Sequence, residues 1–170
     1  MIFKTKRLSA YFIRDDNKHH IIDLYNQKEN IEFIEGIDAE ADIKLSMECY
    51  KTHQNIGSYL FFENETDKFI GVGGIQKQEL MKDGSLAIKD SDIEFLIVMH
   101  KEFGGKGYAS EFCGEFFKVL EDKFPQLKIP ARVNKDNAAC IKLLKKFGFG
   151  IAGEVDYHVY GNKFLLLKRG

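Results

Sequence analysis

Residues 93–109 carry the sequence IEFLIVMHKEFGGKGYA, and this stretch decides the fold. It opens with a largely apolar run, Ile93 to Val98, which is typical of a short buried strand. A glycine-rich turn follows the run. The next residues place apolar side chains at offsets 0, 3, 4, 7, 8 and 11, at Ala109, Phe112, Cys113, Phe116, Phe117 and Leu120. That spacing predicts an amphipathic helix directly after the turn.

Extended and helical segments alternate along the rest of the chain. Strands are expected near residues 8–13, 58–63, 68–76, 128–133, 151–160 and 163–168, and further helices around 21–25, 39–53 and 136–146. No linker-like or repetitive segment interrupts the pattern. We therefore expect one mixed α/β domain over residues 1–170, a sheet with helices on its faces that an antiparallel hairpin closes.

Composition limits the class of protein. Lys and Arg number 25 and Asp and Glu 26, which gives a net charge of −1 and argues against a nucleic-acid binder. The three cysteines form no CxxC pair, as expected for reduced thiols in a cytoplasmic protein. No apolar run approaches the ~20 residues that cross a bilayer, so no membrane association is expected. Cys49 and His53 have metal-ligand spacing but lack further nearby ligands, so no metal site is expected.

The glycine-rich turn points to a phosphate ligand. A strand that feeds such a turn at a helix N-terminus leaves several N–H groups unpaired beside the positive end of the helix dipole. A nucleoside-triphosphate loop does not fit, because Gly107 stands where Ser or Thr is needed. A dinucleotide fingerprint fits poorly, because Ser110 stands at its third glycine. The open alternatives are a diphosphate cradle and a plain connection between strand and helix.

Three motifs in order resemble the GNAT family of acyl-CoA-dependent N-acetyltransferases. Residues 102–107 (EFGGKG) are similar to its Q/R-x-x-G-x-G/A loop, with Glu102 in place of Gln or Arg. Residues 134–140 and 145–149 (NKDNAAC and KKFGF) are similar to its N-x-x-S…E-K-x-G-F segment. Residues 5–8 (TKRL) look like the T-x-R-L opening of the branch that acetylates ribosomal-protein N-termini. The resemblance implies a mostly antiparallel sheet of about seven strands flanked by about four helices.

The resemblance also implies the reaction and its donor. It is transfer of acetyl from acetyl-CoA to a primary amine, on a protein N-terminus or a small molecule, by direct attack in a ternary complex. The diphosphate would be held by backbone N–H groups of the turn, and the thioester carbonyl would be polarised by a backbone N–H at the end of the strand. Asn134 and Asn137 would contact the pantetheine arm, although Asn137 could instead cap a helix beside Asp136. The cofactor-binding residues expected are Val98, Met99, Phe103, Gly104, Gly105, Lys106, Gly107, Tyr108, Ala109, Asn134 and Asn137.

Two residues are expected to carry the proton chemistry. Glu94 lies on the strand that leads to the turn, where partial burial would make its carboxylate basic enough to deprotonate the amine. The alternative for Glu94 is a solvated or salt-bridged strand carboxylate. Cys140 stands where the family often has Ser, and it would lie near the leaving sulfur, as a hydrogen-bond donor or as packing. Leu144 stands where many family members carry a tyrosine acid.

The amine acceptor is the least determined part of the prediction. In the resembled family the connection between the two N-terminal helices borders the acceptor pocket, and here it carries Glu32, Glu35 and Asp38. These carboxylates either attract a cationic amine or form a solvated turn. The competing function is a non-catalytic acyl-CoA binder, and a third hypothesis is a nucleotide-binding domain. A homodimer is left open.

Overall fold

The computed structural model describes residues 1–34, 38–80, 83–86, 88–89, 91–156 and 163–169. Within these ranges the chain forms eight strands, four α-helices and two short 3-10 helices. In chain order they are β1 (Phe3–Lys4), β2 (Leu8–Phe12), α1 (His19–Asn26), η1 (Lys28–Ile31), α2 (Ala39–Thr52), β3 (Ser58–Glu63), β4 (Phe69–Lys77), β5 (Ile93–Met99), η2 (Lys101–Phe103), α3 (Tyr108–Lys123), β6 (Ile129–Asn134), α4 (Ala138–Lys146), β7 (Phe149–Asp156) and β8 (Lys163–Arg169).

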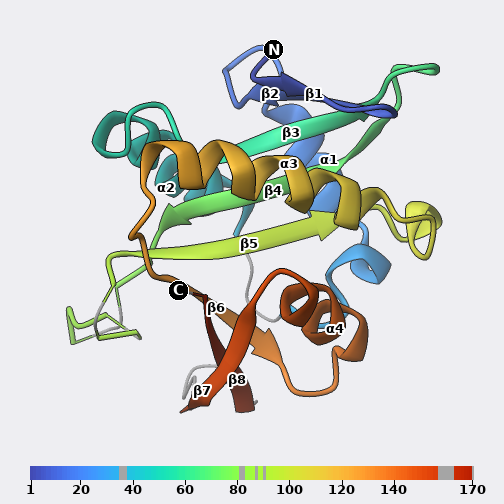
Figure 1. Ribbon diagram of the computed structural model, residues 1–170. Coiled ribbons are helices and arrows are strands. Elements are labelled where there is room, and N and C mark those ends of the chain that lie inside the picture. Colours follow the sequence, from blue (N-terminus) through green and yellow to red (C-terminus); the bar gives the residue numbers. More distant parts are fainter. Residues whose placement is uncertain (35–37, 81–82, 87, 90, 157–162, 170) are drawn as a thin grey trace.

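The strands form two antiparallel sheets. One contains β1 to β5 in chain order, and the other has the order β6-β8-β7. The expected mixed fold, an antiparallel sheet with four helices, is confirmed; the eighth strand is the two-residue β1. No strand pairing joins β5 to β6 in the described ranges, and Figure 1 shows these strands diverging toward the ends from which α3 and α4 continue.

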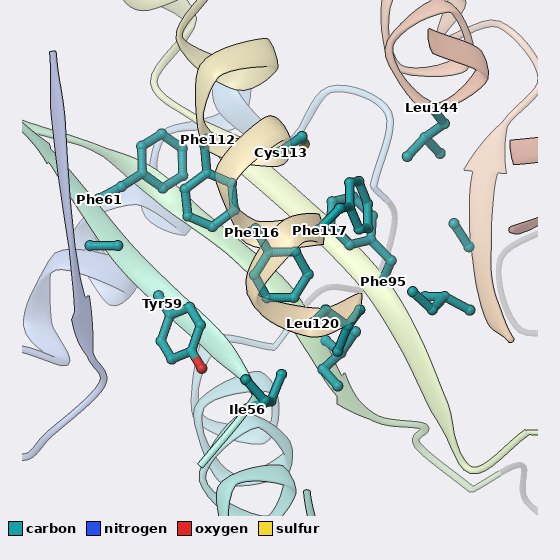
Figure 2. Close-up of a cluster of buried hydrophobic side chains, with 14 of the residues drawn as sticks. Ile56, Tyr59, Phe61, Phe95, Phe112, Cys113, Phe116, Phe117, Leu120 and Leu144 are labelled. Atoms are coloured by element: carbon teal, nitrogen blue, oxygen red, sulfur yellow. The ribbon is translucent and has the colours of Figure 1, made fainter. Parts of the chain in front are cut away.

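The apolar stripe of α3 packs on one face of the larger sheet. Phe112, Phe116 and Leu120 are almost completely buried, as the helical spacing predicts. Figure 2 shows these side chains pointing from α3 toward the sheet, where the Phe112 ring stacks on Phe61 at 4.4 Å between centroids. A Cβ at Gly73 would lie only 2.8 Å from the Phe112 ring, so glycine on β4 permits this close helix–sheet approach.

A second cluster of buried side chains lies between the sheet and the helices α1 and α2. It includes Leu24 and Tyr25 of α1, Ile43 of α2 and Val98 of β5, whereas Phe95 of β5 belongs to the cluster under α3. Figure 1 shows α1 behind the sheet and α3 in front of it. Strand β5 is therefore covered on both faces, which fits its largely apolar sequence. None of the described helices has the length and apolar character that crossing a membrane requires.

Candidate active site

The glycine-rich turn links the end of β5 to the N-terminus of α3. Gly105 and Gly107 have φ values of +72° and +80°, a left-handed conformation that glycine adopts without steric cost. Gly107 is the N-cap of α3, and no side chain caps the helix there. A Cβ built on Gly105 would meet no atom within 4 Å, so the space beside this turn is open. The turn therefore presents bare backbone to any ligand that approaches the helix N-terminus.

The amides of the turn fall into two groups. The N–H of Phe103 donates to the His100 carbonyl and that of Gly104 to the Lys101 carbonyl, each at 3.0 Å. These two amides, expected to bind diphosphate, are thus already used within η2. For residues 105–110, no intrachain acceptor is found among the described residues, as is usual for the first donors of a helix. Of the amides expected to bind diphosphate, those of Gly105 through Ala109 therefore have no partner within the described part of the chain, and the Ser110 amide joins them.

The N-terminal motif TKRL holds this turn in place. The Arg7 Nε donates to Glu111 Oε2 at 2.6 Å, and Arg7 Nη1 donates to the Lys106 carbonyl at 2.9 Å. The guanidinium also lies 4.4 Å from the centre of the Tyr108 ring. The Thr5 hydroxyl donates to Glu111 Oε1 at 2.6 Å. Arg7 and Glu111 were not among the expected site residues, and their role becomes visible only when residues about one hundred positions apart are brought together.

Two buried aromatic side chains pack beside the turn. Phe103 and Tyr108 are each 7% exposed, and their rings make an edge-on contact at 5.9 Å between centroids. The Tyr108 hydroxyl donates to the Glu63 carboxylate on β3. Lys106 is exposed, with its ammonium group 5.5 Å from the centre of the Phe103 ring. Phe103 and Tyr108 thus pack beside the turn, and Lys106 places a positive charge close to it.

The end of β5 places a backbone amide toward the gap between the two sheets. The N–H of His100 donates to the Ile70 carbonyl, and Val98 and Met99 lie opposite Val72 and Gly71. Hydrogen-bonded and non-bonded pairs alternate along an antiparallel ladder, so the amide of Val98 faces β4 and that of Met99 points away from it. Of the two residues expected to polarise the thioester, Met99 has the suitable orientation.

Asn134 is the last residue of β6, and Asn137 and Cys140 lie at the start of α4. Asn137 is the N-cap of α4, and its Oδ1 accepts from the Cys140 amide at 3.1 Å. The Asn134 Oδ1 accepts from the Asp136 amide at 2.9 Å. Asn137 therefore caps the helix, as the alternative prediction had it, and only its side-chain oxygen takes part in the cap. Burial raises the pKa of the Cys140 thiol to about 11, so the thiol keeps its proton at neutral pH.

Glu94 forms a buried ion pair that spans the gap between the sheets. Its side chain is 6% exposed, and both of its oxygens accept from Arg132 of β6, at 2.7 Å from Nε and 2.5 Å from Nη2. This bidentate pairing occupies both carboxylate oxygens with guanidinium N–H groups. The salt-bridged alternative is thus what the structure contains, and the geometry does not favour Glu94 as a proton acceptor. Glu94 and Cys140 also belong to different parts of the site, since Cys140 packs against the cluster under α3.

A second carboxylate, which the sequence did not single out, lies near Glu94. Asp42 of α2 accepts from the Tyr25 hydroxyl at 2.9 Å and from the Gln76 amide nitrogen at 3.1 Å. Gln76 stands directly opposite Glu94 in the β4–β5 ladder. Burial raises the pKa of Asp42 to about 6; bonds from Tyr25 and Gln76 oppose this rise, and the charge of Glu94 adds to it.

The acidic residues expected at the acceptor pocket have other partners. Asp38 is the N-cap of α2, where its Oδ1 accepts from the Glu40 and Ala41 amides at 2.9 and 3.2 Å. Glu32 is exposed and pairs with Lys101 at 3.1 Å. Glu35 lies outside the described residues. The contacts of Asp38 and Glu32 therefore give no indication that either carboxylate faces an acceptor pocket.

A family model for the acetyltransferase (GNAT) domain matches residues 8–150 of this chain. The chain belongs to the GNAT acetyltransferase family. The match covers β5, the turn, β6 and α4, whereas Thr5 and Arg7 lie just before its first residue. The prediction of an acetyl-CoA-dependent N-acetyltransferase is confirmed at the level of the family.

Individual relatives of this GNAT acetyltransferase are distant. The chain is 23% identical over 147 residues to a Bacillus subtilis subsp. natto (strain BEST195) protein named "probable spermine N(1)-acetyltransferase", over 86% of this chain and 90% of the relative. A ribosomal-protein-S5-alanine acetyltransferase from Vibrio fischeri has a similar structure, with a TM-score of 0.73, 13% identity and coverage of 98% and 94% of the two chains. Spermidine N-acetyltransferase from Vibrio cholerae, solved with CoA and spermine, gives a TM-score of 0.62, 17% identity and coverage of 96% and 95%. At these identities the structural likeness shows the fold.

Two departures of this GNAT acetyltransferase from the family pattern are visible in the structure. Leu144, in the position of the tyrosine acid, is fully buried and packs in the core, as Figure 2 shows. Glu102, in the position of Gln or Arg, lies exposed in η2. The Cys49 Sγ lies 3.6 Å from His53 Nδ1, but in the described part of the chain no three His, Cys, Asp or Glu side chains form a metal-binding group.

Proposed function

We propose that this acetyltransferase moves the acetyl group of acetyl-CoA directly to a primary amine while both substrates are bound. The observation that carries the proposal is the row of unpaired amides from Gly105 to Ser110 at the N-terminus of α3. Such a row, together with the helix dipole, stabilises a diphosphate. The open space beside Gly105 fits the approach of phosphate oxygens to the backbone. Residues 105–110 would hold the coenzyme by its diphosphate.

Acetyl-CoA, when bound, supplies an activated thioester. The Met99 amide would stabilise negative charge that develops on the carbonyl oxygen, an effect commonly worth ~3 kcal/mol. Cys140 would donate an S–H hydrogen bond to the departing sulfur, which takes its proton from the attacking nitrogen by way of solvent. Because burial keeps the Cys140 thiol protonated, this residue is poorly suited to attack the thioester itself. This supports direct transfer to the amine without an acetylated enzyme.

Small aliphatic amines are the acceptors that we favour over protein N-termini. The curated relative named above is a spermine acetyltransferase by its name, and a similar solved structure contains spermine. The amine must lose a proton before it attacks, since an ammonium group has no lone pair. A cytoplasmic location stays a prediction from the sequence.

A non-catalytic acyl-CoA binder is the second candidate, and Leu144 is the observation that favours it. A fully buried leucine offers no hydroxyl at the position where the family often has its acid. The two candidates share the cradle and differ only in turnover. They therefore predict the same affinity for coenzyme A.

Initial-rate kinetics with acetyl-CoA and a panel of amines test the proposal. The panel contains spermine, 1,4-diaminobutane, butylamine and a tripeptide with a free N-terminus, and release of the coenzyme thiol reports the reaction. We expect turnover with intersecting double-reciprocal lines, and no acetylated protein by mass spectrometry when the amine is omitted. Coenzyme binding without turnover on any amine would favour the binder. Acetylation of Cys140 would contradict direct transfer.

A further inference from the structure

Five polar side chains form a connected group on the α1–α2 side of the sheet. Tyr25 and Gln76 donate to Asp42, Gln76 lies opposite Glu94, and Glu94 pairs with Arg132. One residue comes from each of the elements α1, α2, β4, β5 and β6. The group therefore gathers two carboxylates at a place where the surrounding side chains are mostly apolar.

The two carboxylates of this group have different charge partners. Arg132 neutralises Glu94 through both of its oxygens. Asp42 accepts only from a hydroxyl and an amide, and no cationic side chain in the described ranges contacts it. The charges of Glu94 and Glu79 also act on Asp42, and because both are negative they raise its pKa. Asp42 is thus a largely buried carboxylate without a counter-charge, and such a group gains from a cation that reaches it.

Gln76 supplies an independent indication that this group can bind a ligand. Its side chain is only 5% exposed, and its Nε2 donates to Asp42. Its Oε1 is buried and has no hydrogen-bond partner in the described part of the protein. A buried amide oxygen without a donor costs roughly 1–3 kcal/mol, and such atoms are rare in native proteins. A ligand that satisfies both side chains brings a hydrogen-bond donor as well as positive charge.

We infer that Asp42 and the Gln76 Oε1 together bind an ammonium group of the amine acceptor. An alkylammonium ion has three N–H donors and no acceptor, which matches a carboxylate and a carbonyl oxygen carried by two hydrogen-bonded side chains. Asp42 is partly exposed, so a ligand can reach it from solvent, while Gln76 forms the buried end. This inference rests on the proposed transfer to an amine and names the acceptor class as a cationic aliphatic amine.

The apolar surroundings fit the rest of such a ligand. Tyr25 and Ile43 are buried beside Asp42, and Ile31, Met47 and Leu96 are partly buried around the same cluster. A methylene chain can pack on these side chains while its ammonium end meets the carboxylate. A protein N-terminus would bring a peptide backbone whose polar groups find few partners there. The ammonium must meet ionised Asp42, so binding should strengthen as pH rises through about 6.

Calorimetry with spermine and 1,4-diaminobutane, in the absence of acetyl-CoA, tests this site. The Asp42→Asn variant keeps the shape of the side chain and removes its charge. We expect spermine affinity to fall at least ~30-fold and acetyl-CoA affinity to stay within twofold. The matched control is Glu40→Gln, which removes an exposed carboxylate two residues away on the same helix and should leave both affinities unchanged. Gln76→Leu removes only the amide and should weaken spermine binding ~10-fold.

The outcomes separate this inference from the proposed function. Unchanged spermine affinity in a folded Asp42→Asn protein would overturn the inference, as would wild-type binding of the tripeptide but of neither alkylamine. Acetyl transfer would then still stand. Spermine binding that depends on Asp42 without any turnover would instead overturn the proposed function and keep the site. Should Asp42→Asn fail to fold, Gln76→Leu decides alone: unchanged affinity would overturn the site.

Discussion

The Arg7 guanidinium bonds both to the Glu111 carboxylate and to the Lys106 carbonyl, at 2.6 and 2.9 Å. Glu111 lies in the first turn of α3, and Lys106 lies within the glycine-rich turn. One side chain from the N-terminal segment therefore fixes the position of the turn relative to the helix it precedes. With Arg7 39% exposed, such a pair adds only about 1 kcal/mol or less to stability. Its main contribution is the geometry of the unpaired amides.

We expect Arg7→Met to weaken acetyl-CoA binding more than it weakens the fold. Loss of the guanidinium frees the Lys106 carbonyl and the Glu111 carboxylate, so the amides of the turn become less ordered. The KM for acetyl-CoA should rise about tenfold, with the KM for the amine unchanged. Lys6→Met, at an exposed neighbouring residue, is the control and should behave as wild type. An unaltered KM for acetyl-CoA in Arg7→Met would show that the turn holds its shape without Arg7.

The Glu94–Arg132 pair predicts a large effect on stability. Removing one partner of a buried ion pair leaves an uncompensated charge and typically costs 3–5 kcal/mol. In urea denaturation, Glu94→Gln should lose about 3 kcal/mol, and the double variant Glu94→Leu with Arg132→Met should recover most of it. A general base would behave differently. Glu94→Gln would then keep its stability and lose the acidic limb of the pH–rate profile, which would restore the role expected from sequence.

Local sequence patterns predicted most of the fold. The run from Ile93, the turn and the apolar spacing from Ala109 each depend on neighbours within a few residues, and the structure confirms strand, turn and helix there. The separation of β5 from β6 was not predicted, because it depends on how two strands about thirty residues apart pack. The sequence favours Asp136 as the N-cap of α4, whereas the structure has Asn137, because both are good capping residues and local sequence does not decide between them.

The candidate site was predictable only in its backbone part. Glycines in sequence indicate a turn with exposed amides, so the turn was predicted. The hydrogen bonds that the Phe103 and Gly104 amides donate to the His100 and Lys101 carbonyls were not. Asp42 was not predicted as a site residue, because no motif in the neighbouring sequence distinguishes it from other acidic residues of the predicted helix. Its partner Gln76 is 34 residues away and meets it only when α2 packs on β4. Local sequence does not show which distant side chains will lie beside a carboxylate, so it could not predict that Asp42 lacks a cationic partner in the described part of the chain.

Gly107 and Gly84 allow backbone strain to be separated from ligand binding. Both have φ of +80°, so alanine at either position should cost roughly 1–2 kcal/mol in stability. A Cβ at Gly107 would also lie 3.4 Å from the Arg7 guanidinium, whereas one at Gly84 meets nothing within 4 Å. Calorimetry should show that Gly107→Ala loses acetyl-CoA affinity at least tenfold and Gly84→Ala keeps it. Equal affinities would contradict the cradle.

Asp42 predicts an unusual dependence of stability on pH. Its pKa is raised from 3.8 to about 6, chiefly by burial, so between these values the folded protein holds a proton that the unfolded chain has lost. Stability should therefore fall as pH rises from about 4 to 6, by up to about 3 kcal/mol, and stay reduced above. Asp42→Asn removes this penalty and should be more stable than wild type in urea at about pH 7.5, with no difference below about pH 4. Spermine should stabilise wild type and not the variant. A variant that is less stable than wild type at neutral pH would show that Asp42 serves the fold rather than a cationic ligand.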